Sequence, residues 1–265
     1  MHVSGLTARE VLPGVFHIRD ALGVYMTLLA GSDGALLVDT GYGLENTAEF
    51  VRTLTPFAPQ VLLTHAHHDH ALGAMWFEKT MMFSQDIPFF SVYTDRERRL
   101  RIAAQAPETA AADYADKDIP LPAAAKEGAI SLGGMTAQIR LCPGHTPGSA
   151  VVYVPERKLL LTGDDWNPCT WLFFEEALAA QEYRGNVRAL LELPFEHVLC
   201  PHREALYPRS EMEAFVLGLT DEALCSAKKV QMGFSLDTRE AEPAPGQQFV
   251  FDFGKTGFAR REEQP

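Results

Sequence analysis

A short apolar strand that runs directly into a cluster of ionisable side chains is the feature that most constrains this chain. Residues 62–73 read LLTHAHHDHALG, so four histidines and an aspartate follow the apolar run within six positions. In layered α/β folds ligands gather at strand ends, because several loops converge there and each rigid strand fixes the origin of its loop. The cluster therefore predicts a functional site at the end of a buried strand.

The rest of the hydrophobic pattern alternates between strands and helices. Apolar β-rich runs separated by turn residues predict hairpins within 24–43 and 135–165. Helices are predicted at 44–55, 71–79, 96–106, 176–192 and 210–231, and further strands at 14–19, 59–64, 195–200 and 247–254. No Gly-, Ser- and Pro-rich linker divides the chain, so residues 1–265 predict a single domain. We interpret the irregular segment 81–127, which several prolines interrupt, as an insertion that shapes the substrate site.

The charge balance argues against a polyanionic partner. Lys and Arg total 23 against 35 Asp and Glu, a formal net charge of −12, whereas nucleic-acid-binding proteins usually carry a basic stripe or patch. We therefore expect a small-molecule substrate and no nucleic-acid partner. The local exception is the arginine run within 96–101, which we interpret as the solvated face of a helix because acidic residues are interleaved. A phosphate-bearing substrate is the alternative explanation of that run.

The N-terminal and cysteine patterns favour a cytoplasmic protein without a membrane partner. The opening MHVSGLTAREVLPGVF lacks the basic and apolar regions of a secretory signal, and no segment approaches the ~20 apolar residues of a membrane span. The four cysteines are widely spaced and form no Cys-x-x-Cys pair, which argues against a disulfide scaffold or a cysteine-rich zinc ribbon.

The histidine cluster has the composition of a metal site. His65, His67, Asp69 and His70 satisfy the pattern His-x-His-x-Asp-His, and imidazole and carboxylate groups are the ligands that suit zinc and related divalent ions. Alternate residues of a strand point in opposite directions, so His65 and His67 can share one metal only if the chain turns into a loop there. Asp69 and His70, at the start of the following helix, would then face a second metal.

Three further candidate ligands each follow a predicted strand. They are His145 in CPGHTPGS, Asp164 in LLLTGDD and His202 in LCPHRE. The order and spacing of these segments, together with LLVDTG at 36–41, resemble the metallo-β-lactamase superfamily of metallohydrolases over residues ~15–205. The resemblance implies an α/β fold of the four-layer αββα sandwich type, with two facing mixed sheets covered by helices.

The resemblance also implies a role for each ligand and two divalent metal ions, zinc with iron or manganese as alternatives. In the family pattern the first metal is held by three histidines, the second by an aspartate and two histidines, and one carboxylate bridges them. The corresponding residues are His65, His67 and His145; Asp69, His70 and His202; and Asp164. Asp39 in LLVDTG resembles the acid that holds the histidine loop by hydrogen bonds. The last segment reads CPHRE where many relatives have Gly-His, and the final ~60 residues match no specific pattern.

Other histidines, acids and thiols near these segments have simpler explanations. His68 occupies the free position of the motif and is expected to support a ligand or to be exposed, and Asp165 is the alternative to Asp164 as the bridge. Ordinary polar or hydrogen-bonded histidines are expected at 2, 17 and 197. The cysteines at 142, 169 and 200 are expected to be small buried residues, with zinc ligation as the alternative.

Hydrolysis is the chemistry that this metal pattern favours. Zinc lowers the pKa of bound water to about 7, and a hydroxide shared by two ions could attack an ester, thioester, lactone or amide, with Asp69 or Asp164 as the transient proton acceptor. PGHTPGSAVVYV and LLLTGD resemble glyoxalase II-like thioester hydrolases, which would require basic residues such as Arg203, Lys228 and Lys229. An iron-dependent oxygenase or redox enzyme and a metal-free binding module are the alternatives from other functional classes.

A group of aromatic residues follows the predicted bridging carboxylate. Trp166, Trp171, Phe173 and Phe174 lie in DWNPCTWLFFEE. Aromatic side chains fill protein cores more often than they line pockets, but any that line the site would indicate a substrate with an apolar portion.

Overall fold

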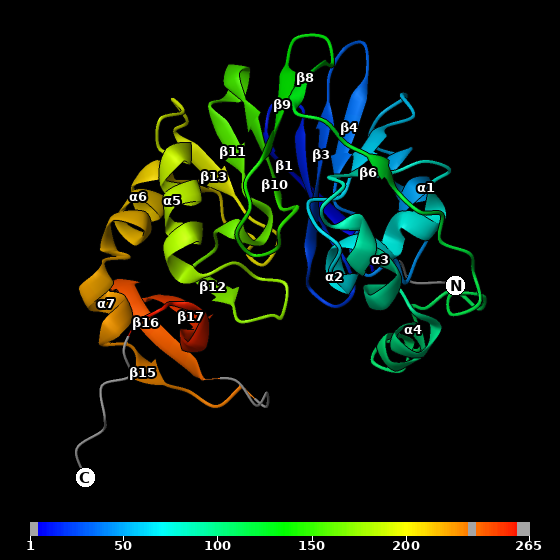
Figure 1. Cartoon of the computed structure of the whole chain (residues 1–265). Coiled ribbons are helices and arrows are strands. Elements are labelled where there is room, and N and C mark those ends of the chain that lie inside the picture. Colours follow the sequence, from blue (N-terminus) through cyan, green and yellow to red (C-terminus); the bar gives the residue numbers. More distant parts are fainter. Residues whose placement is uncertain (1–4, 233–236, 259–265) are drawn as a thin grey trace.

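The chain folds into two facing β-sheets with helices on their outer sides (Figure 1). The computed structural model describes residues 5–232 and 237–258. In these ranges the first sheet has seven strands in sequential order: β1 (Thr7–Leu12), β2 (Val15–Arg19), β3 (Tyr25–Ala30), β4 (Ala35–Val38), β5 (Gln60–Leu62), β6 (Met81–Met82) and β7 (Ala123–Ala124). β1 to β4 form an antiparallel meander, and β4 to β7 pair in parallel.

The second sheet is built from the second half of the chain. Its six strands in the described ranges follow the order β14-β13-β11-β10-β9-β8. They are β8 (Gly128–Ser131), β9 (Thr136–Leu141), β10 (Ala150–Val154), β11 (Leu159–Leu161), β13 (His197–Leu199) and β14 (Tyr207–Pro208). Leu29 and Leu36 of the first sheet meet Val152 and Leu161 of the second in one buried cluster. Each such side chain contributes about 1.5–3 kcal/mol of burial free energy, so the interface between the sheets is a main core of the fold.

Helices cover the outer face of each sheet. On the first sheet, Leu28 and Leu37 share a buried cluster with Val51 of α1 (Thr47–Val51) and Phe90 of α3 (Ile87–Tyr93). On the second sheet, Val151 and Val198 share a buried cluster with residues of α5 (Ala180–Leu190) and α6 (Arg209–Gly218). The fold therefore has four layers in the order helix, sheet, sheet, helix, as predicted. The remaining short helices are α2 (His68–Ala71), α4 (Arg96–Ala103), α7 (Asp221–Cys225), η1 (Leu72–Trp76), η2 (Pro155–Arg157), η3 (Gly163–Asp165) and η4 (Phe253–Lys255).

A third sheet adds to the four layers at the C-terminal end. In the described residues its order is β12-β17-β16-β15, with β12 (Cys169–Leu172), β15 (Lys228–Lys229), β16 (Thr238–Ala244) and β17 (Gln247–Asp252). The predicted late strand is β17, but the sheet itself was not predicted. Phe249 of β17 stacks on Tyr183 of α5 at 5.2 Å between ring centroids and contacts Phe215 of α6. The sheet, of which β15 to β17 are orange to red and β12 yellow-green in Figure 1, thus shares the core of the second helix layer.

The single helix predicted over 210–231 is wrong in its second half. α6 ends at Gly218, after which Leu219 leaves helical geometry with φ of −74° and ψ of 63°. Gly218 itself packs so tightly against the Pro243 carbonyl that a Cβ would lie 1.7 Å from the oxygen. The chain then restarts as α7, where the Thr220 side chain accepts a hydrogen bond from the amide of Ala223. Residues 228–229 leave the helix altogether and form β15.

The segment 81–127 supplies β6 and β7, the last two strands of the first sheet, and it corrects the interpretation of the arginine run. Arg99 is buried, and its guanidinium donates to the carbonyls of Tyr114 and Lys117. Ile102 of α4 joins Tyr114 in a small buried cluster against η1. One arginine of the run is therefore a structural part of this segment rather than a solvated residue.

Among the described residues, no helix is long and apolar enough to cross a lipid bilayer.

Candidate metal centre

Loops from both sheets bring the seven predicted ligands to one edge of the sandwich. His65 and His67 follow β5, and His67 is the extended residue from which α2 begins, so that the chain turns as the shared site requires. Asp69 and His70 lie in the first turn of that helix. The other three side chains are His145 between β9 and β10, Asp164 in η3 after β11, and His202 after β13.

The side chains form three overlapping groups. Within each group, every candidate ligand atom lies within 4.8 Å of the others. The groups are His65, His67 and His145; His65, His70 and Asp164; and Asp69, His70 and His202. The middle group joins the other two, because it shares His65 with the first and His70 with the third.

The unpaired atoms of this cluster fit divalent cations. In the described part of the chain, His65 Nε2, His70 Nε2 and Asp164 Oδ1 are buried without a hydrogen-bond partner, a condition that costs about 1–3 kcal/mol for each group. His67 Nδ1 faces His145 Nε2 at 2.9 Å, while the opposite ring nitrogens contact Glu176 Oε1 and the Trp171 carbonyl. Those acceptors assign the protons to the outer nitrogens, so two lone pairs face each other. A cation held between them removes that repulsion.

Burial and neighbouring charges set the protonation of the cluster. Burial, followed by the adjacent histidines, holds the pKa of His65 well below its usual range, and burial and His67 lower the pKa of His145 to about 4. Both rings are therefore neutral, which is the form that binds metals. Burial opposes ionisation of Asp69 and Asp164, but the neighbouring histidines outweigh it and lower the pKa of both carboxyl groups.

Asp39 holds the histidine loop. Its backbone is left-handed, with φ of 64°, at the turn after β4. One carboxylate oxygen accepts from the Thr64 amide at 2.7 Å, and the other accepts from His70 Nδ1 at 2.9 Å. A hydrogen bond at Nδ1 orients the ring and leaves Nε2 as the ligand atom.

Two buried acids that support the ligand loops were missed by the sequence reasoning. Asp86 accepts from the amides of Ala66 and Gly148 and from the Thr146 hydroxyl, so it ties the His65–His67 loop to the His145 loop. Glu176 accepts from His67 Nε2 at 2.8 Å. Asp86 precedes an Ile-Pro helix start and Glu176 stands in an acidic pair, and neither context differs from that of an ordinary surface acid.

The other candidates near the centre do not join the ligand groups formed by the described residues. Asp165, the alternative bridge, is buried and accepts the backbone amide of His145 at 2.9 Å. Burial holds its pKa well above the usual range. Cys142 lies buried beside Asp165, Cys200 is buried, and all four cysteines are free thiols. His68 lines the cleft in front of the centre.

Comparison with known proteins places this arrangement in a family. The sequence profile described as the metallo-beta-lactamase superfamily matches residues 19–202. This chain belongs to the metallo-β-lactamase superfamily. The predicted family and layered fold are thereby confirmed, and the matched region contains all seven candidate ligands.

Individual relatives are distant. The chain is similar to the acyl-coenzyme A thioesterase MBLAC2 of Gallus gallus, with 25% identity over 185 residues that cover 63% of this chain and 66% of that protein. It therefore spans just under two thirds of that relative's length. A metallo-beta-lactamase from Pontibacter korlensis has a TM-score of 0.58 at 18% identity, covering 78% of this chain and 95% of that one. TTHA1623, solved in a di-iron-bound form, has a TM-score of 0.51 at 25% identity over 71% of this chain and 90% of that one.

A cleft of about 730 Å³ opens in front of the candidate centre of this superfamily member. Trp171 and Phe174 line it, whereas Trp166 and Phe173 are buried in the core. The predicted aromatic group is thus divided between pocket and core. The cleft is also lined by Leu22, Val24, Tyr42, Tyr93, Arg98 and Arg203.

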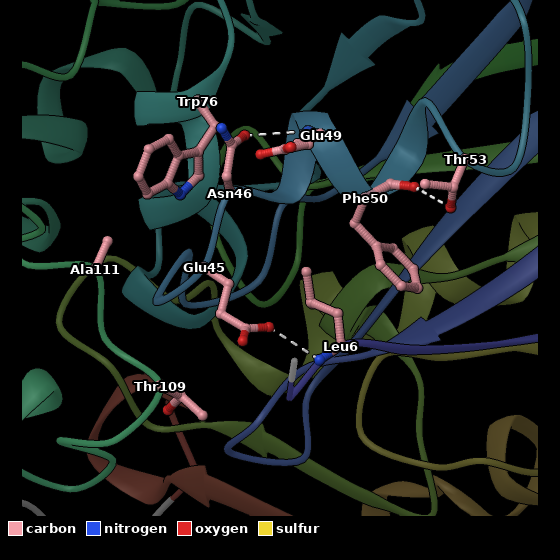
Figure 2. Close-up of a pocket in the computed structure, with 9 residues that line it drawn as sticks. All are labelled: Leu6, Glu45, Asn46, Glu49, Phe50, Thr53, Trp76, Thr109 and Ala111. Carbon is pink, nitrogen blue, oxygen red and sulfur yellow. Dashed lines mark hydrogen bonds between the residues drawn. The ribbon is translucent and has the colours of Figure 1, made fainter. Parts of the chain in front are cut away.

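A second hollow of about 450 Å³ lies away from the centre and shares no lining residue with the cleft (Figure 2). Leu6, Phe50 and Trp76 supply much of its wall. Glu45 reaches across it to accept the backbone amides of Gly5 and Leu6. The hollow contains none of the candidate ligands, so the cleft is the site of interest.

His17 supports the loop that carries His202. Its ring is buried, stacks on Tyr25 at 4.4 Å between centroids, and places Nε2 3.0 Å from the Arg203 carbonyl. It is the hydrogen-bonded core histidine expected from the sequence. His197 lies on β13, partly buried, and His2 lies outside the described residues.

The buried His17 predicts a loss of stability in mild acid. Burial lowers the pKa of His17 to about 4, so between that value and about 6.5 the unfolded chain binds more protons than the folded one. Stability is then complete above about pH 6.5 and decreases as the pH falls. Between about pH 7 and pH 5, we expect the free energy of unfolding, measured in urea, to fall by about 2 kcal/mol more in the wild type than in His17→Gln. Equal losses in the two proteins would contradict this.

Proposed function

We propose that this chain is a dinuclear, zinc-dependent thioesterase that acts on acyl thioesters with an anionic carrier such as coenzyme A. The observation that carries the proposal is the cleft, where aromatic side chains and two arginines lie in front of the same metal-ligating cluster. The aromatic side suits an acyl chain, and guanidinium groups suit phosphate oxygens. The name of the Gallus gallus relative, an acyl-coenzyme A thioesterase, supports the same substrate class.

The metal ligands divide into two sets with one shared carboxylate. His65, His67 and His145 would hold one ion and Asp69, His70 and His202 the other, and Asp164 lies within reach of both sets. When bound, divalent ions supply a lowered pKa for water and polarise a carbonyl oxygen. The sharing of Asp164 favours two ions over one.

The protein side chains supply binding, orientation and a place for a proton. Asp164 lies 12% exposed and Asp69 16% exposed at the floor of the cleft, so either carboxylate can take a proton from an attacking water. Burial and the nearby carboxylates, Asp69 first, raise the pKa of Tyr42, so its phenol stays protonated. Tyr42 lines the cleft and can donate a hydrogen bond to a substrate oxygen.

The basic residues expected for a thioesterase are only partly the ones predicted. Lys228 and Lys229 lie exposed on β15 and do not line the cleft, whereas Arg203 does. Arg98 joins it from α4, with its guanidinium 5.0 Å from the Tyr93 ring centroid. A phosphate-bearing substrate was the alternative explanation of the arginine run. The position of Arg98 in the cleft favours that explanation for this one arginine.

Turnover of a substrate panel tests the proposal. Zinc-loaded protein is given a long-chain acyl-coenzyme A, a glutathione thioester, an acyl-homoserine lactone and a cephalosporin, and its metal content is measured in parallel. We expect the acyl-coenzyme A to have the highest kcat/KM and the protein to hold two zinc ions. Faster turnover of the lactone or the cephalosporin would overturn the thioesterase proposal, and activity only with bound iron would overturn the zinc assignment.

Arg98→Leu tests the anionic part of the substrate. Loss of a charge-assisted hydrogen bond costs about 1.5–3 kcal/mol, so we expect KM for acyl-coenzyme A to rise at least about tenfold. An acyl thioester of a short neutral thiol should be hydrolysed as by the wild type. Arg96→Leu is the matched control, because Arg96 pairs with Asp116 on the surface and does not line the cleft. Equal effects on both thioesters would contradict recognition of phosphate by Arg98.

A further inference from the structure

Glu176 lies behind the metal ligand His67, on the side away from the other ligands. Its side chain is 5% exposed, and Oε1 lies 2.8 Å from His67 Nε2 and 2.5 Å from the Tyr93 hydroxyl. Burial opposes its ionisation, but the hydrogen bonds from His67 and Tyr93 outweigh burial and lower the pKa of Glu176 to about 2. A carboxylate that accepts the outer N–H of a ligating histidine fixes both the tautomer and the ring orientation.

The same segment also orients a second ligand. His145 Nδ1 lies 2.7 Å from the carbonyl of Trp171, which belongs to β12. The segment from Trp171 to Glu176 therefore contacts two of the three members of the His65, His67 and His145 group. We name residues 171–177 the support segment.

The end of the described chain, β16 to η4 (residues 238–255), which we name the C-terminal unit, holds the support segment in place. β12 pairs in parallel with β17, from Cys169 opposite Gln248 to Leu172 opposite Phe251. Beyond the end of β12, Lys255 Nζ donates to the carbonyls of Phe174, Glu175 and Ala177, at 2.9, 2.7 and 2.8 Å. An ammonium group has three N–H donors, so all of them are used on this one loop.

These contacts come from a part of the chain that the superfamily profile does not match. The match ends at residue 202, whereas β17 and Lys255 follow it. Two of the carbonyls held by Lys255 flank Glu176 on either side in the sequence. A fixed ammonium group therefore restricts the backbone from which the Glu176 side chain reaches His67.

We propose that Glu176 is a positioning residue for the metal ligand His67, and that Lys255 acts through Glu176 by holding the support segment. The C-terminal unit is then part of the metal centre's support rather than an independent addition. This inference depends on the superfamily metal site and not on the identity of the substrate, so it is tested by zinc affinity, whatever bond the enzyme cleaves.

The test is a double-mutant cycle read out as zinc affinity. Glu176→Ala, Lys255→Met and the double variant are titrated with zinc against a chromophoric chelator, with the wild type and Lys229→Met as references. Lys229 is an exposed lysine on β15 of the same sheet. Supporting residues of ligating histidines typically contribute 10–100-fold to metal affinity. We expect Glu176→Ala to weaken zinc binding by at least about tenfold and Lys255→Met by about fivefold.

The cycle distinguishes action through Glu176 from a general structural role. If Lys255 acts through Glu176, Lys255→Met has little further effect on zinc affinity in the Glu176→Ala background. Additive effects, or wild-type affinity in either single variant, would overturn the proposal. If Lys255→Met does not fold, Lys255→Gln, which keeps two N–H donors, takes its place in the same cycle. Unfolding of the zinc-free proteins provides the stability reference.

Discussion

Asp164→Ala is expected to abolish hydrolysis while the chain stays folded. Asp164 is the carboxylate that contacts both ligand sets, with an oxygen 3.6 Å from His145 Nε2 of the first set and 3.1 Å from His202 Nε2 of the second. In the proposed two-metal site, its removal takes away the shared ligand and a proton acceptor at once. We expect kcat/KM to fall by at least about a thousandfold, which corresponds to about 4 kcal/mol of transition-state stabilisation. We also expect fewer than two zinc ions per chain in metal analysis.

Asp165→Asn is the matched comparison for this experiment. Asp165 is the adjacent residue and also an aspartate, but its Oδ1 accepts the His145 amide and it belongs to none of the ligand groups formed by the described residues. Asparagine keeps that acceptor, so we expect two bound zinc ions and kcat/KM within about tenfold of the wild type. A larger loss in Asp165→Asn than in Asp164→Ala would reverse the assignment of the bridging carboxylate.

Asp86→Ala is expected to have the largest effect on stability. Its two oxygens accept from the Ala66 amide at 3.1 Å, the Thr146 hydroxyl at 2.7 Å and the Gly148 amide at 2.6 Å. Alanine would leave two buried amides without acceptors and a cavity between the ligand loops. We expect about 4 kcal/mol of destabilisation and a thermal midpoint lower by roughly 10 °C, measured at fixed zinc concentration.

Asp86→Asn separates the hydrogen bonds from the packing. Asparagine fills the same volume but has one acceptor oxygen, so one of the two amides loses its partner. Stability should then fall between the wild type and Asp86→Ala. If Asp86→Asn and Asp86→Ala were equally destabilised, the hydrogen bonds would not be what joins the two loops. If both matched the wild type, Asp86 would have no structural role.

Local patterns in the sequence were sufficient for the fold class and for the set of candidate metal ligands. Continuous apolar runs precede His65, Asp164 and His202 in the sequence. Such runs predict buried strands from neighbouring residues alone. The ligands follow those strands directly, and the structure brings all seven together. Periodicity failed after Gly218, where the chain leaves the helix before restarting as α7, and again at residues 228–229, which form β15.

Only the tertiary structure showed which residues support the ligands. Asp86 lies 62 residues from Gly148 in the sequence, Glu176 lies 109 from His67, and Lys255 lies 80 from Glu175. None of these partners is near in sequence. The hydrophobic pattern around a single Asp, Glu or Lys residue does not show whether its side chain is buried. The same holds for the aromatic group, where Trp166 entered the core and Trp171 the cleft. The sequence by itself predicted the two facing sheets and the candidate ligand set through local spacing, whereas long-range packing decided the third sheet and which groups hold those candidate ligands in place.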